Sequence, residues 1–299
     1  RWYLGGKGLE KFRERMLSDP HIRELHDYLA PEVVFPGTNN RGGICYFIRD
    51  QGYDASKSMG TRVITHDESG IISDTTRPLN TFGSGVFLRN SAGVEIVQKV
   101  ITSENFEAFS QHVSPRKPFG LDGNIVNAPE FHKFPTGVDD PVLCFGKAKK
   151  LGYVSKKIVR SHRDWIDDWK VFTPYANNIG TELNDDNQNA FIGAPGSVCS
   201  ETFLIMGIGL GLNEGSAINL IAYLKTKFAR FLHAQAKISQ HGTKMTYRFL
   251  PTIDLTSGSP INWKSNTDAL DQQLFSMFNL KARERDHIRN STTCMCWSY

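Results

Sequence analysis

The chain of 299 residues is long enough for one large or two modest hydrophobic cores, because single domains commonly hold about 100–200 residues. Hydrophobic residues at 39% and charged residues at 22% exclude a disordered protein, and no apolar run approaches the roughly 20 residues of a membrane span, so we expect no membrane partner. The net charge of +4 does not separate a nucleic-acid-binding protein from an ordinary basic enzyme.

Helical and strand-like patterns alternate in the first third of the chain. Apolar residues at helical spacing predict a short amphipathic helix over 8–17, and Asp19-Pro20 ends it. Strands are predicted over 22–29, 44–48 and 62–65, and a helix is favoured over a strand in 86–101. This alternation is typical of the far edge of an α/β sheet, where a hairpin closes an otherwise parallel arrangement.

A change of composition follows, since residues 105–137 are rich in Pro, Gly, Asn and Ser. We therefore predict two units, 1–105 and 106–299. In the second unit, strands are predicted over 142–145, 154–159, 170–172 and 202–206. One long helix is predicted over 213–239 with Asn213 as its N-cap, and a terminal amphipathic helix from Asp268 onward.

The five cysteines are odd in number and mostly scattered through apolar runs. This favours reduced thiols and a cytoplasmic location over a disulfide framework. The close pair Cys294 and Cys296 has a spacing that suits no common zinc site, so no metal site is predicted. The opening Arg1-Trp2-Tyr3 contains neither an initiator Met nor a secretory pattern, which indicates a piece of a longer protein.

Two glycine-containing runs are the most informative part of the sequence, RWYLGGKGL at 1–9 and VVFPGTNNRGGICYF at 33–47. Four more follow in order: RKPFG at 116–120, SVCSET at 197–202, FARFL at 228–232 and YRFLP at 247–251. Together they resemble the late motifs of adenine-specific DNA methyltransferases from type II restriction-modification systems, the TaqI-like group and its larger relatives that combine modification with cleavage. The resemblance covers nearly the whole chain except its last few residues.

The resemblance implies a fold and a function. Residues 1–105 would form the C-terminal edge of a doubly wound methyltransferase sheet, and 106–299 a mixed α/β target-recognition domain that binds double-stranded DNA. The full-length enzyme would transfer a methyl group from S-adenosylmethionine to adenine. The glycine-rich donor loop and the Asn- or Asp-Pro-Pro-aromatic motif of the family are not found in this sequence. We therefore expect no bound cofactor and no turnover without an upstream catalytic portion or a separate catalytic chain.

The resemblance also assigns a role to Phe35. In this family the target adenine swings out of the duplex, because its amine cannot otherwise meet the methyl donor. Phe35 matches the aromatic that stacks on this base, a contact typically worth about 1–3 kcal/mol. Gly37, Gly42 and Gly43 would let the backbone approach the nucleotide closely. From the residues alone, Phe35 could equally cap the core beside a tight turn.

Several basic clusters predict contacts with DNA phosphates, although a solvated surface is the alternative for each cluster. On the helix predicted over 213–239, the apolar stripe leaves Lys227, Arg230 and Lys237 on an exposed flank. The residues predicted to contact DNA are Arg41, Arg116, Lys117, Lys156, Lys157, Arg160, Lys227, Arg230, Lys237, Lys244 and Arg248.

Two other functions stay open: a DNA-binding specificity subunit that acts with a separate catalytic chain, and a metal-dependent nuclease. Asp168-Trp169-Lys170 has the acid-x-Lys shape of a nuclease site, but it lacks a strand-borne partner acid, so a solvated turn before a strand is expected. The glycine run 207–211 superficially resembles a nucleotide-binding loop. The acidic residue expected about 20 positions later is missing, which favours a tight strand-to-helix connection.

Overall fold

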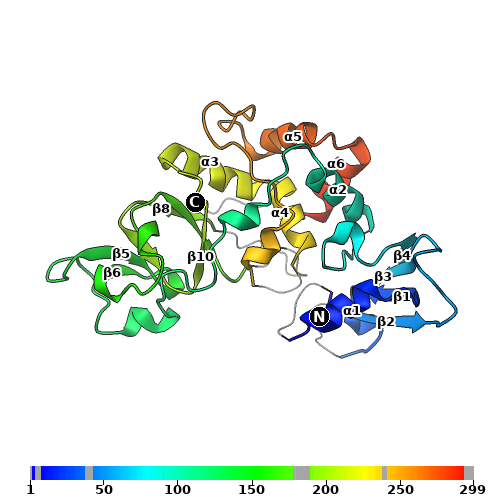
Figure 1. The fold of residues 1–299 in the computed structure, drawn as a ribbon. Coiled ribbons are helices and arrows are strands. Elements are labelled where there is room, and N and C mark those ends of the chain that lie inside the picture. Colours follow the sequence, from blue (N-terminus) through cyan, green and yellow to red (C-terminus); the bar gives the residue numbers. More distant parts are fainter. Residues whose placement is uncertain are drawn as a thin grey trace.

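The computed structural model describes residues 2–3, 8–37, 43–89, 91–177, 179, 189–237 and 241–292. The β1–β4 sheet lies at one side of the molecule, strands β5 to β10 lie at the other, and helices α3 and α4 lie between them (Figure 1). The predicted mixed α/β class is thus confirmed. No helix in the described part of the chain is both long and apolar enough to cross a bilayer.

The first sheet has the strand order β2-β1-β3-β4. Its elements are α1 (Glu10–Ser18), β1 (Ile22–Tyr28), β2 (Ile44–Arg49), β3 (Thr61–Asp67) and β4 (Gly70–Arg77). Strands β1 and β3 are parallel, whereas the β1–β2 and β3–β4 pairs are antiparallel. The predicted helix and three strands are confirmed. Strand β4 was not predicted, because its second half, SDTTR, is polar. That this sheet is the edge of a larger doubly wound sheet stays a prediction.

The two faces of this sheet differ because successive side chains of a strand point to opposite sides. Ile22, Leu25 and Val63 are fully buried on one face. They pack against side chains from α1 and from segments that precede and follow the sheet in the sequence: Trp2, Tyr3, Met16, Leu17, Leu79 and Phe87. The opposite face carries Glu24, His26 and Tyr28 of β1. One side of the sheet is therefore a core and the other is polar and aromatic.

Helix α2 (Ser91–Ile101) confirms the helix that was favoured for this segment. Its buried side chains Val94, Ile96, Val97 and Val100 belong to a core shared with four later helices. These are α3 (Glu214–Lys225), α4 (Lys227–Gln235), α5 (Thr267–Met277) and α6 (Ala282–Ser291). Helix α2 lies beside α6 (Figure 1). The predicted boundary between the units at 105–106 stays a prediction, and the core joins α2 to the C-terminal helices.

The single long helix predicted over 213–239 is wrong, because the helix breaks at Thr226. This residue has an extended backbone with φ −61° and ψ 148°. Its hydroxyl donates to the Tyr223 carbonyl and accepts from the Ala229 amide, so it ends α3 and caps α4. The carboxylate of Asp271 accepts two further amides at the start of α4, from Lys227 at 3.0 Å and Phe228 at 2.8 Å.

The remaining strands form two small sheets of three, with orders β10-β7-β8 and β6-β5-β9. They are β5 (Pro141–Phe145), β6 (Leu151–Ser155), β7 (Lys170–Pro174), β8 (Phe191–Gly193), β9 (Ser197–Cys199) and β10 (Phe203–Met206). The strand predicted over 154–159 ends early, because the Ser155 hydroxyl accepts the Lys157 amide and starts a 3₁₀ turn. The described 3₁₀ helices are 31–33, 81–83, 109–112, 123–127, 147–149, 156–158, 163–165 and 244–247.

Candidate nucleic-acid interface

The Phe35 turn connects β1 to β2. A 3₁₀ helix at Pro31–Val33 starts the turn, and the Phe35 amide donates to the Pro31 carbonyl at 2.9 Å. The side chain of Phe35 is 53% exposed, so it does not cap the core. Gly37 has φ +80°, which favours glycine. Arg41 and Gly42 lie outside the described residues.

Gly43 closes the turn over a buried ion pair. Its φ is +75°, and an added Cβ would lie 2.3 Å from both the Tyr28 carbonyl oxygen and Nη2 of Arg89. Arg89 donates to both carboxylate oxygens of Asp27 at 2.7 Å, and Asp27 is fully buried. Packing therefore explains the glycine at this position, because a larger side chain would collide with Arg89, which passes beneath Gly43. Its predicted role toward a nucleotide is untested.

Two loops that are about forty residues apart in the sequence meet within residues 106–299. The Arg160 amide donates to the Phe119 carbonyl at 3.2 Å, and Nδ1 of His162 lies 2.7 Å from the Pro118 carbonyl. Gly120 at φ +74° allows this approach, since its added Cβ would lie 3.0 Å from the Cβ of Arg160. Three predicted DNA-contacting residues, Arg116, Lys117 and Arg160, are thereby brought to one region.

An aromatic pair extends this region. The Gly242 amide donates to the Tyr175 carbonyl at 2.7 Å, and the rings of Tyr175 and His241 stack with centroids 4.8 Å apart. The guanidinium of Arg116 lies 5.0 Å from the centre of the Tyr175 ring. Lys244, which is exposed, follows three residues after His241. We call this set the basic–aromatic surface: Arg116, Lys117, Arg160, Tyr175, His241 and Lys244.

Sequence reasoning missed Tyr175 and His241. They lie 66 positions apart and carry no spacing signal, and the pairing of Ala176 with His241 brings them together in the fold. Burial lowers the pKa of His241, and the positive charges of Arg116 and Lys237 lower it further. A neutral imidazole stacked on a phenol is an apolar face with polar edges. This suits a flat polar ligand such as a nucleobase.

The basic side chains of residues 106–299 differ in their ion-pair partners. Four pair with partly or well exposed carboxylates: Arg116 with Glu201, Lys117 with Asp122, Lys156 with Asp167 and Lys157 with Asp139. Exposed pairs are worth about 0–1 kcal/mol, so these cations can exchange a carboxylate for a phosphate at little cost. Arg160 and Lys244 are exposed and pair with no carboxylate in the described part of the chain.

The prediction that Arg230 and Lys237 lie on an exposed helix flank is wrong, because these residues are only 2% and 3% exposed. Nζ of Lys237 donates to the carbonyls of Asn177 and Ile179, and burial lowers its pKa to about 7. Arg230 lies where its charge acts on Asp271: burial raises the pKa of Asp271, and Arg230 opposes this rise. Neither side chain can reach a phosphate without leaving the core.

Two further residues that were predicted to contact DNA already donate side-chain hydrogen bonds to backbone carbonyls. Nζ of Lys227 donates to the Arg289 carbonyl of α6 at 2.9 Å. Arg248 donates to the Met245 carbonyl at 2.8 Å and to the Ser84 carbonyl at 3.1 Å. The second bond joins the chain near α4 to the segment that leads into α2. Structural roles therefore compete with DNA contact at both residues.

The rival motifs have structural explanations. β10 ends at Met206, α3 begins at Glu214, and a Cβ added to Gly207 would lie 2.4 Å from the Leu212 side chain, so the glycine run is a tight strand-to-helix connection as expected. The solvated position expected for Lys170 is wrong, because this residue starts β7 and is buried, and its Nζ donates to the Ile166 and Asp168 carbonyls of the preceding turn. No group of three or more His, Cys, Asp or Glu side chains in the described ranges is arranged to hold a metal ion.

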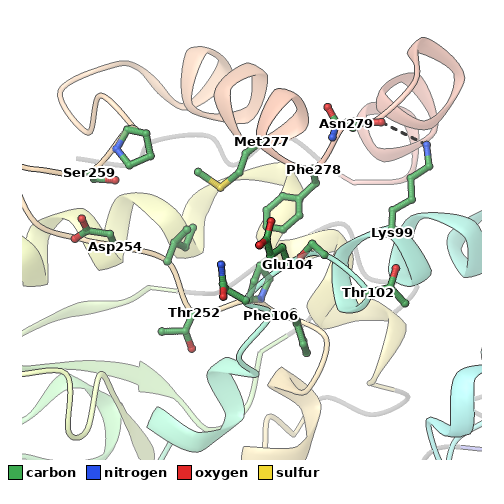
Figure 2. A pocket seen from close by; sticks show the side chains of 15 residues that line it. Lys99, Thr102, Glu104, Phe106, Thr252, Asp254, Ser259, Met277, Phe278 and Asn279 are labelled. Carbon is green, nitrogen blue, oxygen red and sulfur yellow. Dashed lines mark hydrogen bonds between the residues drawn. The ribbon is translucent and has the colours of Figure 1, made fainter.

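A separate groove of 730 Å³ opens between the end of α5 and the segments 102–106 and 251–254. Figure 2 shows Met277 and Phe278 on one side of it and Phe106 and Thr252 on the other. Glu104 and Asp254 also line it, and Nζ of Lys99 is already held by Glu284 at 2.7 Å. Carboxylates repel phosphates, so the groove does not extend the basic–aromatic surface.

No protein-family model matches the sequence, and a comparison with curated proteins gives no match. Among solved structures, the chain is similar to the type IIG restriction endonuclease BpuSI, with 12% sequence identity and a TM-score of 0.37. The aligned region covers 97% of this chain and 45% of the BpuSI chain, so the chain spans less than half the length of that protein.

Proposed function

We propose that this chain is the DNA-contacting portion of an S-adenosylmethionine-dependent, adenine-specific DNA methyltransferase of a restriction-modification system. The basic–aromatic surface is the observation that supports DNA as the partner. It combines cations that can exchange a carboxylate for a phosphate at little cost with the stacked rings of Tyr175 and His241, and DNA contacts use both features. Methyl transfer, and the binding of S-adenosylmethionine, would fall to a catalytic portion upstream on the same polypeptide or to a separate chain.

The proposal is tested by measuring the affinity of this chain for a fluorescent DNA duplex across a salt series. If Arg116, Lys117, Arg160 and Lys244 each meet a phosphate, the slope of log affinity against log salt is about −3.6, because each phosphate contributes about −0.9. Fluorescence anisotropy measures the affinity at each salt concentration. A flat salt response, or no binding at all, contradicts the DNA-contacting role.

A second expected result concerns the exposed ring of Phe35. In the enzyme that includes the catalytic portion, Phe35→Ala lowers turnover strongly and DNA affinity little, because the ring would stack on the flipped adenine and not on the duplex. Turnover is measured by methyl transfer to duplex DNA, and affinity by anisotropy on the same duplex. Unchanged turnover in the variant would remove Phe35 from the base pocket.

A further inference from the structure

Four aromatic rings stack on the polar face of the first sheet. Tyr46 stacks on His26 with centroids 4.3 Å apart, His26 lies 5.2 Å from His66, and His66 stacks on Tyr28 at 4.1 Å. The register explains this arrangement, since His26 pairs with Tyr46 across β1 and β2, and Tyr28 pairs with His66 across β1 and β3. The His66 ring is shielded from solvent, with 9% of the residue exposed, whereas Tyr46 is 47% exposed.

A chain of short polar contacts runs through the two histidines. Nε2 of His26 lies 2.7 Å from Oε1 of Glu24, and Nδ1 of His26 lies 2.9 Å from Nε2 of His66. Because the Glu24 carboxylate accepts the Nε2 proton of His26, the two facing nitrogens share a single hydrogen. With no added proton, His66 donates to His26; with one added proton, the charged His26 donates to His66. Both states keep the observed geometry.

A second added proton cannot be accommodated in this way. Both facing nitrogens would then carry hydrogen, and two positive rings would meet at hydrogen-bond distance. We propose that His26 and His66 act as one proton-binding unit, which holds the ring stack closed with zero or one added proton and opens it with the second. The unit is a pH-sensitive switch built into the sheet.

Charged side chains of three strands surround the two histidines. Glu24 faces His26 from β1, Arg62 of β3 bridges Glu24 and Asp74 of β4, and Asp27 lies on the opposite face of β1. The hydrogen bond from His26 lowers the pKa of Glu24, so this carboxylate stays charged beside the imidazole.

His66 is in a different position. Burial lowers the pKa of His66, the charge of His26 lowers it further, and Asp27 only partly opposes these effects. A histidine whose pKa is lowered in the folded state destabilises the fold as the pH drops below the unfolded value of about 6.5, since the unfolded chain then binds more protons. The stability of the stack is therefore lost on the acid side of neutrality.

The switch is connected to the turn that carries Phe35. The Leu29 amide donates to the His66 carbonyl at 2.9 Å, and the Tyr28 ring that stacks on His66 immediately precedes Leu29. Opening of the stack moves His66, which packs on Tyr28 together with Tyr46, at the point where the chain leaves β1. We therefore expect the start of the segment 29–35 to respond to the second proton.

An NMR titration of the whole chain from neutral to mildly acidic pH tests the proposal. We expect the His26 and His66 ring signals to report two shared protonation steps separated by more than about one pH unit. The ring signals of Tyr28 and Tyr46 should stay constant through the first step and shift in the second. Independent titration of the two histidines near 6.5, with constant tyrosine signals, would overturn the proposal.

Two variants and a control sharpen this test. His66→Gln and His26→Gln each leave one titrating ring, so the tyrosine signals should no longer respond to acid in either variant. His132→Gln removes an exposed histidine outside the first sheet and should leave both steps unchanged. If the tyrosine response persists in whichever of the two variants folds, a different group drives it and the proposal is wrong.

Discussion

The variant Arg89→Ala is expected to lower the free energy of unfolding by about 3–5 kcal/mol, because it strands the buried charge of Asp27. Asp27 is fully buried, and Arg89 supplies two of its hydrogen bonds at 2.7 Å. The Tyr3 hydroxyl at 3.2 Å would be the remaining donor described for this carboxylate. Arg89 also bonds the Tyr28 carbonyl beneath Gly43, so the loss should extend to the turn that carries Phe35.

Urea unfolding followed by circular dichroism measures this effect. Arg283→Ala is the matched control, because Arg283 forms an exposed pair with Glu95 and its loss should cost at most about 1 kcal/mol. Arg89→Lys keeps the charge but loses the two-pronged contact, so an intermediate loss is expected. If Arg89→Ala costs no more than the control, the pair does not hold the sheet together.

A fourfold variant of the basic–aromatic surface is expected to weaken the salt dependence of DNA affinity strongly. Replacing Arg116, Lys117, Arg160 and Lys244 by glutamine removes about four phosphate contacts. Between about 50 and 200 mM salt, the parent chain should then lose about 10²-fold more affinity than the variant, since each contact contributes about 0.9 to the salt slope. Anisotropy with the same duplex across the salt series measures both slopes.

The control for this variant removes the same number of positive charges elsewhere. Arg23, Arg49, Lys57 and Arg283 are exposed and each pairs with a carboxylate, as do Arg116 and Lys117. Their fourfold replacement by glutamine should leave the salt slope near that of the parent chain. An equal decrease of the salt slope in both variants would show that net charge alone governs binding. The basic–aromatic surface would then not be the DNA-contacting surface.

Local patterns in the sequence predicted most of the first sheet. The spacing of apolar residues placed α1, β1, β2 and β3 close to their observed bounds, because helical and strand periodicities are properties of a few neighbouring residues. The same reasoning missed β4, whose SDTTR half lacks an apolar alternation, and joined α3 to α4. The break at Thr226 is held by the hydroxyl of Thr226 and by an Asp271 carboxylate that comes from 45 positions later in the chain.

The candidate site shows the same division. The sequence by itself determined which residues are basic and that Phe35 sits in a glycine-containing turn, and the structure places that ring outside the core. Only the tertiary structure decided which cations can reach a ligand. Lys237, just beyond α4, is buried where its Nζ bonds the carbonyls of Asn177 and Ile179, and Arg230 of α4 is buried near Asp271. Arg116, Arg160 and the Tyr175–His241 pair converge through contacts between distant segments. Exposure and convergence depend on long-range packing, and a local periodicity carries no information about it.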